Sequence, residues 1–297
     1  MLYNKPSLTI AEQITKLKGR GLLFANESQA TKTLANISYY RLRAYTYPFQ
    51  NNDSNNQSFK QRISFEEIIQ LYTFDRKLSV LIFECIEKIE ISFRTQLIYN
   101  LSIKHGSHWH LKIELFRDFE RFINHSSTLI KEVDRSNETF IEHYNTKYSK
   151  PSSPPCWMSL EVSSMGLLSK IFQNLKKTTE KKAITTHFGL SDVSLLENWM
   201  FCFCALRNIL AHHGRIWNRR LPTIKLPERP THLFLVNKNI HANKLYATLA
   251  CIQYVLKTTN LEISFGSQLK QLMNTCPLAQ SKEMGFPTEW EKEKLWI

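Results

Sequence analysis

The residues best suited to chemistry form one short run, Arg207-Asn208-Ile209-Leu210-Ala211-His212-His213, at the end of the most apolar segment of the chain. Arginine and histidine are costly to place beside apolar side chains unless other groups offset their desolvation. Arginine holds a phosphate with two hydrogen bonds and stays charged, and histidine exchanges a proton near neutral pH. Together they can cleave RNA without a metal: one group moves the proton of the 2′-hydroxyl or of the leaving oxygen, and a fixed cation stabilises the phosphorane-like transition state.

The spacing of these residues limits what a single helix can do with them. Asn208 and His212 are four residues apart and share a face, whereas Arg207 and His212 are five residues apart and differ by about 140° of helical rotation. Two copies of the helix, or a local distortion after Ala211, would bring Arg207 and His212 together. Gly214 is compatible with a helix that ends there. From periodicity alone, side chains that merely cap and solvate a helix end are the favoured interpretation.

The charge of the chain points to an anionic partner. Its 297 residues include 39 Lys and Arg against 26 Asp and Glu, a formal net charge of +13, and such a protein attracts nucleic acid or, less often, an anionic membrane surface. Counted in successive fifties, the net charge is +5, −1, +1, +1 and +7, with 0 for the last 47 residues. Two basic segments, 1–50 and 201–250, predict a surface for phosphates. For the first of them a merely solvated basic face is an equal alternative.

Aromatic and basic side chains alternate over residues 38–49. Tyr40, Arg41 and Arg43 in this run suit base stacking combined with phosphate contact. Ordinary packing against a helix is the favoured alternative for most of the tyrosines. A helix-turn-helix-like arrangement of the N-terminal helices, which would favour duplex DNA, is a third interpretation.

The elements that must position these residues are expected to be helices throughout. Helical periodicity recurs along the chain, and only 8 Gly and 10 Pro are present. The region 65–104 has no Gly or Pro and predicts one long helix or two in tandem. We expect further helices at 8–18, 26–37, 115–148, 157–175, 178–188, after Asp192, and at 242–257 and 264–274, with a loop at 150–155 and an extended segment at 221–230. The polar run 51–58 predicts a boundary between an N-terminal helical region, 1–50, and a helical domain, 60–297.

Several other chemistries are disfavoured by the sequence. No segment reaches the roughly 18–20 apolar residues that span a bilayer, and the N-terminus has no signal-peptide pattern. The six cysteines are scattered through apolar helical patterns, as is typical of free thiols in a reducing compartment, so we expect a cytoplasmic protein without a membrane partner. A weak candidate for a metal site is the cluster of His105, His108 and His110. We expect Cys202 and Cys204 to lie in the core and not to bind a metal. We expect no metal and no cofactor.

The run Arg207 to His212 has the form R-N-x-x-x-H and resembles the R-x(4–6)-H signature of the HEPN superfamily of α-helical ribonucleases. Flanking segments resemble, in the same order, the Abi-like (AbiD/AbiF) abortive-infection family of bacteria. These segments are Ser38-Tyr39-Tyr40-Arg41-Leu42, Phe93-Arg94-Thr95-Gln96 followed by Gly106 and Trp109, Pro155 with Trp157, His213, Arg215, Trp217-Asn218 and Arg219, and Met284-Gly285-Phe286-Pro287 with Trp290. The resemblance extends from about residue 8 to the C-terminus.

This resemblance implies a HEPN-type helical bundle with a small helical N-terminal extension. It also implies a metal-independent endoribonuclease toxin of a phage-defence or toxin-antitoxin system, which leaves a 2′,3′-cyclic phosphate and a 5′-hydroxyl. HEPN nucleases generally combine two R-x4-H motifs, and this chain has one clear copy, so the resemblance implies a homodimer. An RNA-binding scaffold without catalysis is the alternative. Some relatives are paired with a small non-coding RNA, which would then be a second RNA partner.

The roles implied for individual residues follow the same resemblance. His212 would transfer protons, Arg207 would clamp the phosphate, and Asn208 would orient the substrate by a hydrogen bond. Arg94 could reach the site or instead pair with Glu90 or Glu197. The RNA contacts expected in all are His213, Arg215, Arg219, Arg220, Tyr40, Arg41, Arg43 and Arg94.

Overall fold

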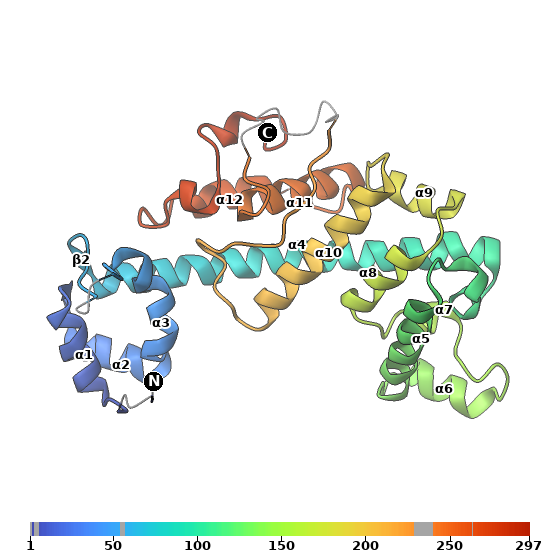
Figure 1. The fold of residues 1–297 in the computed structure, drawn as a ribbon, viewed down its shortest axis with the longest axis horizontal. Helices are drawn as coiled ribbons and strands as arrows, with labels where there is room; N and C mark the ends of the chain where they lie inside the picture. The colour runs from blue at the N-terminus through green and yellow to red at the C-terminus, as the bar shows by residue number, and fades with distance from the viewer. Residues whose placement is uncertain (1, 3–5, 54–56, 229–239, 263) are drawn as a thin grey trace. The chain divides into compact units, whose positions relative to one another are not determined.

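A computed structural model describes residues 2, 6–53, 57–228, 240–262 and 264–297 of the chain. Within this part the protein consists of α-helices, short 3₁₀ turns and one pair of two-residue strands, which confirms the prediction of an all-α protein (Figure 1). The helices are α1 (Ile10–Gly19), α2 (Glu27–Asn36), α3 (Tyr39–Thr46), α4 (Phe65–His105), α5 (Phe119–Asp134), α6 (Thr139–Lys147), α7 (Cys156–Ser159), α8 (Met165–Asn174), α9 (Thr179–His187), α10 (Val193–Ala211), α11 (Leu245–Thr259) and α12 (Phe265–Met273), and the strands are β1 (Leu22–Leu23) and β2 (Ile63–Ser64).

The chain divides into two compact units. Unit 1 comprises residues 1–79 and 271–280, and unit 2 comprises residues 80–270 and 281–297. The helix α4 therefore supplies its first residues to unit 1 and its remainder to unit 2. The predicted separation of an N-terminal region 1–50 from a domain 60–297 stays a prediction about how the chain is organised.

Unit 1 is built from α1 to α3, the strand pair and the start of α4. The first helix begins with a capping box, in which the Thr9 hydroxyl accepts a hydrogen bond from the Glu12 N–H and the Glu12 carboxylate accepts one from the Thr9 N–H at 2.7 Å. The parallel pairing of Leu22 with Ile63 was not predicted, because two-residue strands carry no periodic signal. The buried hydroxyl of Tyr45 donates to Asp75 at 2.7 Å. Packing, the favoured alternative for most tyrosines of this run, is confirmed for Tyr45.

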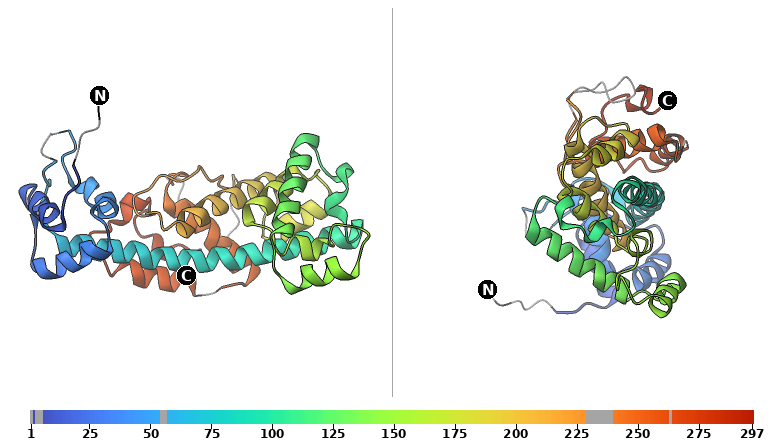
Figure 2. Two further views of the ribbon diagram at one scale, coloured as in Figure 1. Left: turned by 90° about the horizontal axis from the view of Figure 1, so that it is seen from below. Right: turned by 90° about the vertical axis from the view of Figure 1, so that its right-hand side faces the viewer.

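The long run without glycine or proline folds as one helix, α4, and not as two in tandem. Its 41 residues continue without a break (Figure 2). An apolar stripe along it is almost completely buried, from Leu71 through Ile82 and Ile89 to Leu97. The helix ends directly before Gly106, the first glycine after residue 65, which takes a φ of +81° that other residues adopt only at a cost.

Unit 2 contains the rest of α4, the helices α5 to α11 and the first residues of α12. Two long helices predicted from the sequence are wrong, because serine side chains interrupt them. The stretch 115–148 is split where the Ser136 hydroxyl accepts a hydrogen bond from the Glu138 N–H at 3.3 Å, between α5 and α6. The stretch 157–175 is split between α7 and α8, where Ser164 becomes the N-cap of α8.

The centre of unit 2 is formed by α8, α10 and α11. The helix α8 packs against both α5 and α10 (Figure 1). Residues Leu245 to Leu256 of α11 are buried on every side, which is the pattern of a helix in the middle of a core. All six cysteines are free thiols, five of them buried. Among the helices that the structure describes, none has both the length and the apolar character that a bilayer crossing requires.

Candidate functional site

The helix α10 carries the proposed catalytic run and is fixed by both its N-cap and its apolar face. The Asp192 carboxylate accepts a hydrogen bond from the Ser194 N–H at 2.8 Å, which starts the helix where the sequence predicts it. Trp199, Phe203 and Leu206 are completely buried. Because this face is held in the core of unit 2, the run Arg207 to His212 is presented at the C-terminal end of a rigid element.

The end of α10 is a tight hydrogen-bonded turn. The His212 N–H donates to the Asn208 carbonyl at 3.1 Å, so helical geometry continues to His212. The His213 N–H then donates to the Leu210 carbonyl at 2.9 Å and the Gly214 N–H to the Ile209 carbonyl at 2.8 Å, the pattern of a Schellman motif. The predicted end of the helix at this point is confirmed.

The positive φ of this turn and its close packing fall on two different residues. His213, and not Gly214, adopts the left-handed conformation, with a φ of +56°. Gly214 is needed for space, because a Cβ there would lie 2.9 Å from the Ile209 side chain and 3.1 Å from the Ile209 carbonyl oxygen. A non-glycine residue at positive φ stores strain of about 1–3 kcal/mol, and such strain is common at functional sites.

Arg207 is anchored to the long helix by a carboxylate that it shares with a second arginine. Its Nε lies 3.9 Å from Glu90 Oε2, and its side chain is 36% exposed. Glu90 Oε1 accepts a hydrogen bond from Arg94 Nη2 at 3.1 Å. Glu90 is itself mostly buried, and it therefore steers the Arg207 guanidinium while leaving much of it open to solvent.

Arg94 belongs to the interior. It is 9% exposed, and its guanidinium also donates to the Leu160 carbonyl at 3.0 Å and to the Ser163 carbonyl at 3.1 Å. Of the two carboxylates considered for it, Glu90 is its partner. Glu197 instead accepts from the buried Lys181 at 2.6 Å. These contacts give Arg94 a positioning role toward Glu90.

Asn208 and His212 lie on a different side of α10 from the apolar core. Both are exposed, and the Asn208 amide lies 3.9 Å from the Cys204 sulfur one turn earlier. Together with Phe201, which is 51% exposed, and the partly exposed Ala205, they form a stripe with spacings of four, three and four residues. Since no distortion precedes His212, the rotation of about 140° between Arg207 and His212 is preserved.

The basic residues after the helix form a turn over a buried anchor. Ile216 and Trp217 are buried, and the Arg215 guanidinium lies 5.8 Å from the centre of the Trp217 ring. Arg215 also donates to the Asn218 carbonyl at 3.4 Å, and Arg219 donates to the Arg215 carbonyl at 3.3 Å. The exposed residues of this segment are His213, Arg219 and Arg220. Contact of this turn with RNA stays a prediction, and residues 229–239 of the basic segment lie outside the described part of the chain.

The N-terminal aromatic and basic residues lie in unit 1. Tyr40 is 81% exposed and Arg43 is partly exposed. The Arg41 guanidinium lies 5.8 Å from the centre of the Tyr72 ring, which holds it against α4. Base stacking on Tyr40 is compatible with its exposure and stays a prediction.

The histidine cluster does not converge on one point. His108 and His110 stack with ring centroids 6.0 Å apart, and His110 is buried. His105 lies 3.7 Å from Glu180, on the other side of Gly106. Cys202 is buried as predicted, whereas Cys204 is only half-buried beside Gly166 of α8.

The structure also brings together residues that the sequence did not single out. Arg121 and His125 of α5 and Lys170 of α8 line a pocket that adjoins α10. A spacing of four residues between Arg121 and His125 was a visible signal on α5. Nothing in the sequence linked either residue to Lys170, because the packing of α5 on α8 is a tertiary contact.

Comparison with known proteins gives one match. A family model described as Abi-like protein matches residues 32–218, more than half of the chain. The matched region begins in α2 and ends just after the Schellman turn of α10. No curated protein and no solved structure matches the chain.

Proposed function

Because the chain belongs to the Abi-like protein family, we propose that it acts in abortive infection, as a metal-independent endoribonuclease of the HEPN type. Family membership supports the role in phage defence. The arrangement of Arg207, Asn208 and His212 carries the enzymatic part of the proposal. All three reach solvent at the end of a helix whose apolar face is buried, and Arg207 is oriented by Glu90 at 3.9 Å.

The proposed reaction uses the 2′-hydroxyl of the RNA as the nucleophile. Its oxygen attacks the adjacent phosphorus, the bond to the 5′-oxygen breaks, and the products are a 2′,3′-cyclic phosphate and a 5′-hydroxyl. His212 of one copy takes the proton of the 2′-hydroxyl opposite Arg207 of the second copy, and the leaving 5′-oxygen takes up a proton from water. Arg207 binds the non-bridging oxygens and stabilises their increased charge in the transition state.

A homodimer is part of this proposal because one copy does not bring Arg207 and His212 onto the same side of α10. The stripe of Phe201, Ala205, Asn208 and His212 offers a surface for a second copy. Ala205 would allow close approach of the two helices, and the exposed Phe201 would bury apolar area at the contact.

Cleavage of single-stranded RNA in EDTA tests the enzymatic proposal. We expect wild-type protein to cut RNA, and to leave intact an RNA with 2′-deoxyribose at the cut position. His212→Ala should abolish the cleavage. Equal rates with the deoxy substrate or with His212→Ala would refute the mechanism, and tight, salt-sensitive RNA binding without any cleavage would favour the non-catalytic scaffold.

Mixing two inactive variants tests whether the site is shared between subunits. Arg207→Ala and His212→Ala proteins, each inactive alone, should regain partial activity after they are mixed and allowed to exchange subunits. A mixed dimer keeps one intact arginine opposite one intact histidine. Phe201→Glu provides the control, since a charge within the stripe should yield monomers in sedimentation and prevent the rescue. A mixture of stable dimers without rescue would refute the shared site.

A further inference from the structure

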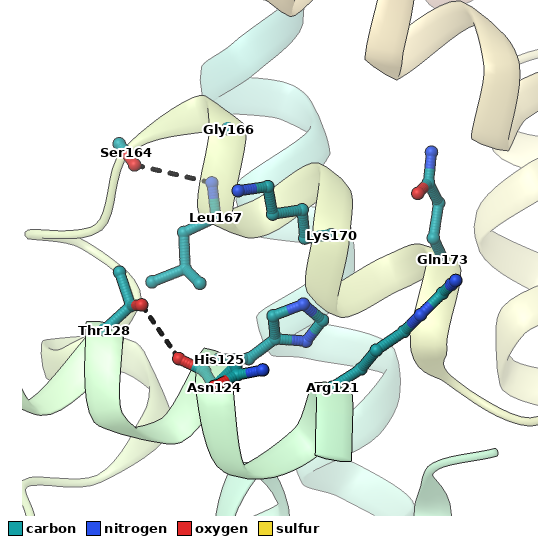
Figure 3. Close-up of a pocket in the computed structure, with 9 residues that line it drawn as sticks. All are labelled: Arg121, Asn124, His125, Thr128, Ser164, Gly166, Leu167, Lys170 and Gln173. Atoms are coloured by element: carbon teal, nitrogen blue, oxygen red, sulfur yellow. Dashed lines mark hydrogen bonds between the residues drawn. The ribbon is translucent and has the colours of Figure 1, made fainter. Parts of the chain in front are cut away.

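A pocket of about 500 Å³ lies between α5 and α8 in unit 2. Figure 3 shows Arg121, Asn124, His125 and Thr128 on α5 facing Gly166, Leu167, Lys170 and Gln173 on α8, with Ser164 at the start of α8. Most of these side chains carry hydrogen-bond donors. The pocket is therefore a polar cavity in a unit whose other interhelical contacts are largely apolar.

The charge inside this pocket is positive. Burial, together with repulsion by Lys170 and Arg121, lowers the pKa of His125. Arg121, His125 and Lys170 all line this one pocket, and no carboxylate is among its lining residues. Two carboxylates lie outside the lining: Asp118 is 3.5 Å from Arg121 and acts on the pKa of His125 in the opposite direction, and Glu132 accepts a hydrogen bond from Ser164 at 3.0 Å.

Part of the hydrogen-bonding capacity of the pocket is unused. The Nδ1 atom of His125 is buried and has no hydrogen-bond partner among the described residues. Lys170 is exposed and forms no ion pair in the part of the chain that the structure describes. A buried polar atom without a partner is uncommon in native proteins and calls for an explanation. An anion between Arg121, His125 and Lys170 would supply the missing acceptor.

The pocket is next to the helix that carries the proposed active site. The Gln173 amide donates to the Glu197 carbonyl of α10 at 3.3 Å, and a Cβ on Gly166 would lie 3.5 Å from the Cys204 sulfur. The helices α8 and α10 therefore run antiparallel in contact. From Cys204 to His212 the helix rises about 12 Å. This places the pocket a few nucleotides from the bond that His212 would act on.

We propose that this pocket binds a backbone phosphate of the substrate RNA, through Arg121, Lys170 and His125. The inference rests on the proposed function, because it names where the strand continues beyond the cut. A single strand follows a positive groove by such phosphate contacts, which hold it without reading its sequence. The pocket would therefore set affinity and register and leave the chemical step to Arg207 and His212.

Binding of a fluorescent single-stranded RNA of twelve nucleotides tests the proposal, in a His212→Ala background where the strand stays intact. Lys170→Gln should raise the Kd about tenfold and lower the slope of log Kd against log salt concentration by about 0.7, the value for one phosphate contact on a single strand. Lys182→Gln removes an exposed lysine of α9 in the same unit and is the matched control, with no such change expected. In otherwise wild-type protein, Lys170→Gln should raise KM and leave kcat unchanged.

The possible outcomes separate the pocket from the proposed function. RNA binding by wild-type protein with the same Kd for Lys170→Gln and for an Arg121→Gln, Lys170→Gln double variant would overturn the pocket assignment and leave the function standing. If these variants lose the binding of inorganic phosphate in calorimetry but bind RNA as the wild type does, the pocket is an anion site independent of RNA. This result would also overturn the proposal. If wild-type protein binds no RNA at all, the proposed function fails together with the inference. Thermal melting of each variant confirms that both cations, which are exposed, are dispensable for folding.

Discussion

The two arginines that share Glu90 should respond in opposite ways to truncation. Arg94 is 9% exposed and has three partners, namely Glu90 and the carbonyls of Leu160 and Ser163. Arg207 is 36% exposed and lies 3.9 Å from the same carboxylate. Arg94→Ala and Arg207→Ala each remove one cation from Glu90. The differences between the two variants in melting temperature and in cleavage rate therefore separate a structural role from a catalytic one.

The expected magnitudes follow from burial. Removal of one partner from a buried ion pair costs about 3–5 kcal/mol of unfolding free energy, and Arg94→Ala also leaves two carbonyls without their donor. A partly exposed pair at the distance of Arg207 contributes about 0–1 kcal/mol. With about 2 °C of melting temperature per kcal/mol in a chain of this size, Arg94→Ala should lose about 6–10 °C and Arg207→Ala at most about 2 °C.

Activity should show the reverse order. Removal of a group that stabilises transition-state charge typically lowers kcat by about 10²–10³-fold, and this is the loss expected for Arg207→Ala. Arg94→Ala, assayed well below its melting temperature, should retain more activity because Arg207 is still present. Arg207→Lys keeps the charge and loses the two-pronged contact, so it should fall between wild type and Arg207→Ala.

Differential scanning fluorimetry and RNA cleavage on the same preparations provide the two measurements. If Arg207→Ala melts as low as Arg94→Ala, Arg207 is a structural residue, and the catalytic role proposed for it is refuted. If Arg207→Ala is as stable as the wild type and cleaves RNA at the full rate, the catalytic role is refuted as well.

Three further predictions concern stability. Burial lowers the pKa of His110 from 6.5 to about 4, so its contribution is complete above pH 6.5 and is lost, by about 3 kcal/mol in full, as the pH falls from 6.5 to 4; urea unfolding at pH 7 and 4.5 should show less acid sensitivity in His110→Phe, and an unchanged sensitivity would contradict this. Lys181 is completely buried and donates to Glu197 at 2.6 Å, so Lys181→Ala and Lys181→Met, which both leave this carboxylate without its lysine, should each lose about 3 kcal/mol in chemical denaturation; recovery of most of the loss by methionine, which restores the volume but not the charge, would argue against a charge effect. Gly189→Ala should cost about 2–4 kcal/mol, because φ is +73° and a Cβ would lie 2.5 Å from a methyl group of α11; Gly19→Ala, with open space around it, should be neutral or slightly stabilising in the same melting assay.

Several local features of the fold could be predicted from the sequence. The caps at Thr9, Asn26 and Asp192 start α1, α2 and α10 where the pattern of polar and apolar residues indicates. The absence of glycine and proline before Gly106 accounts for the length of α4. These features depend on residues within one or two helical turns of each other, so a short stretch of sequence contains all the residues that determine them.

Other features could not be predicted because competing local signals were nearly equal. The apolar periodicity of 115–148 continues through Ser136, but the chain turns there: the Ser136 N–H donates to the Val133 carbonyl at 3.0 Å, and the Ser136 hydroxyl accepts from the Glu138 N–H at 3.3 Å. Likewise, Gly214 indicates that the helix ends there, but the left-handed residue of the turn is His213, and Gly214 is required by the close approach of Ile209.

The sequence by itself determined that Arg207, Asn208 and His212 lie at the end of an apolar helix and that Arg207 and His212 point to different sides of it, since both follow from the period of the α-helix. Only the tertiary structure decided which arginine is buried. Arg94 and Arg207 have the same chemistry and compete for the same carboxylate, but the carbonyls of residues 160 and 163 enclose the first and leave the second in solvent. The cationic pocket of α5 and α8 was decided in the same way, because burial and the field of distant charges depend on contacts between residues far apart in the chain.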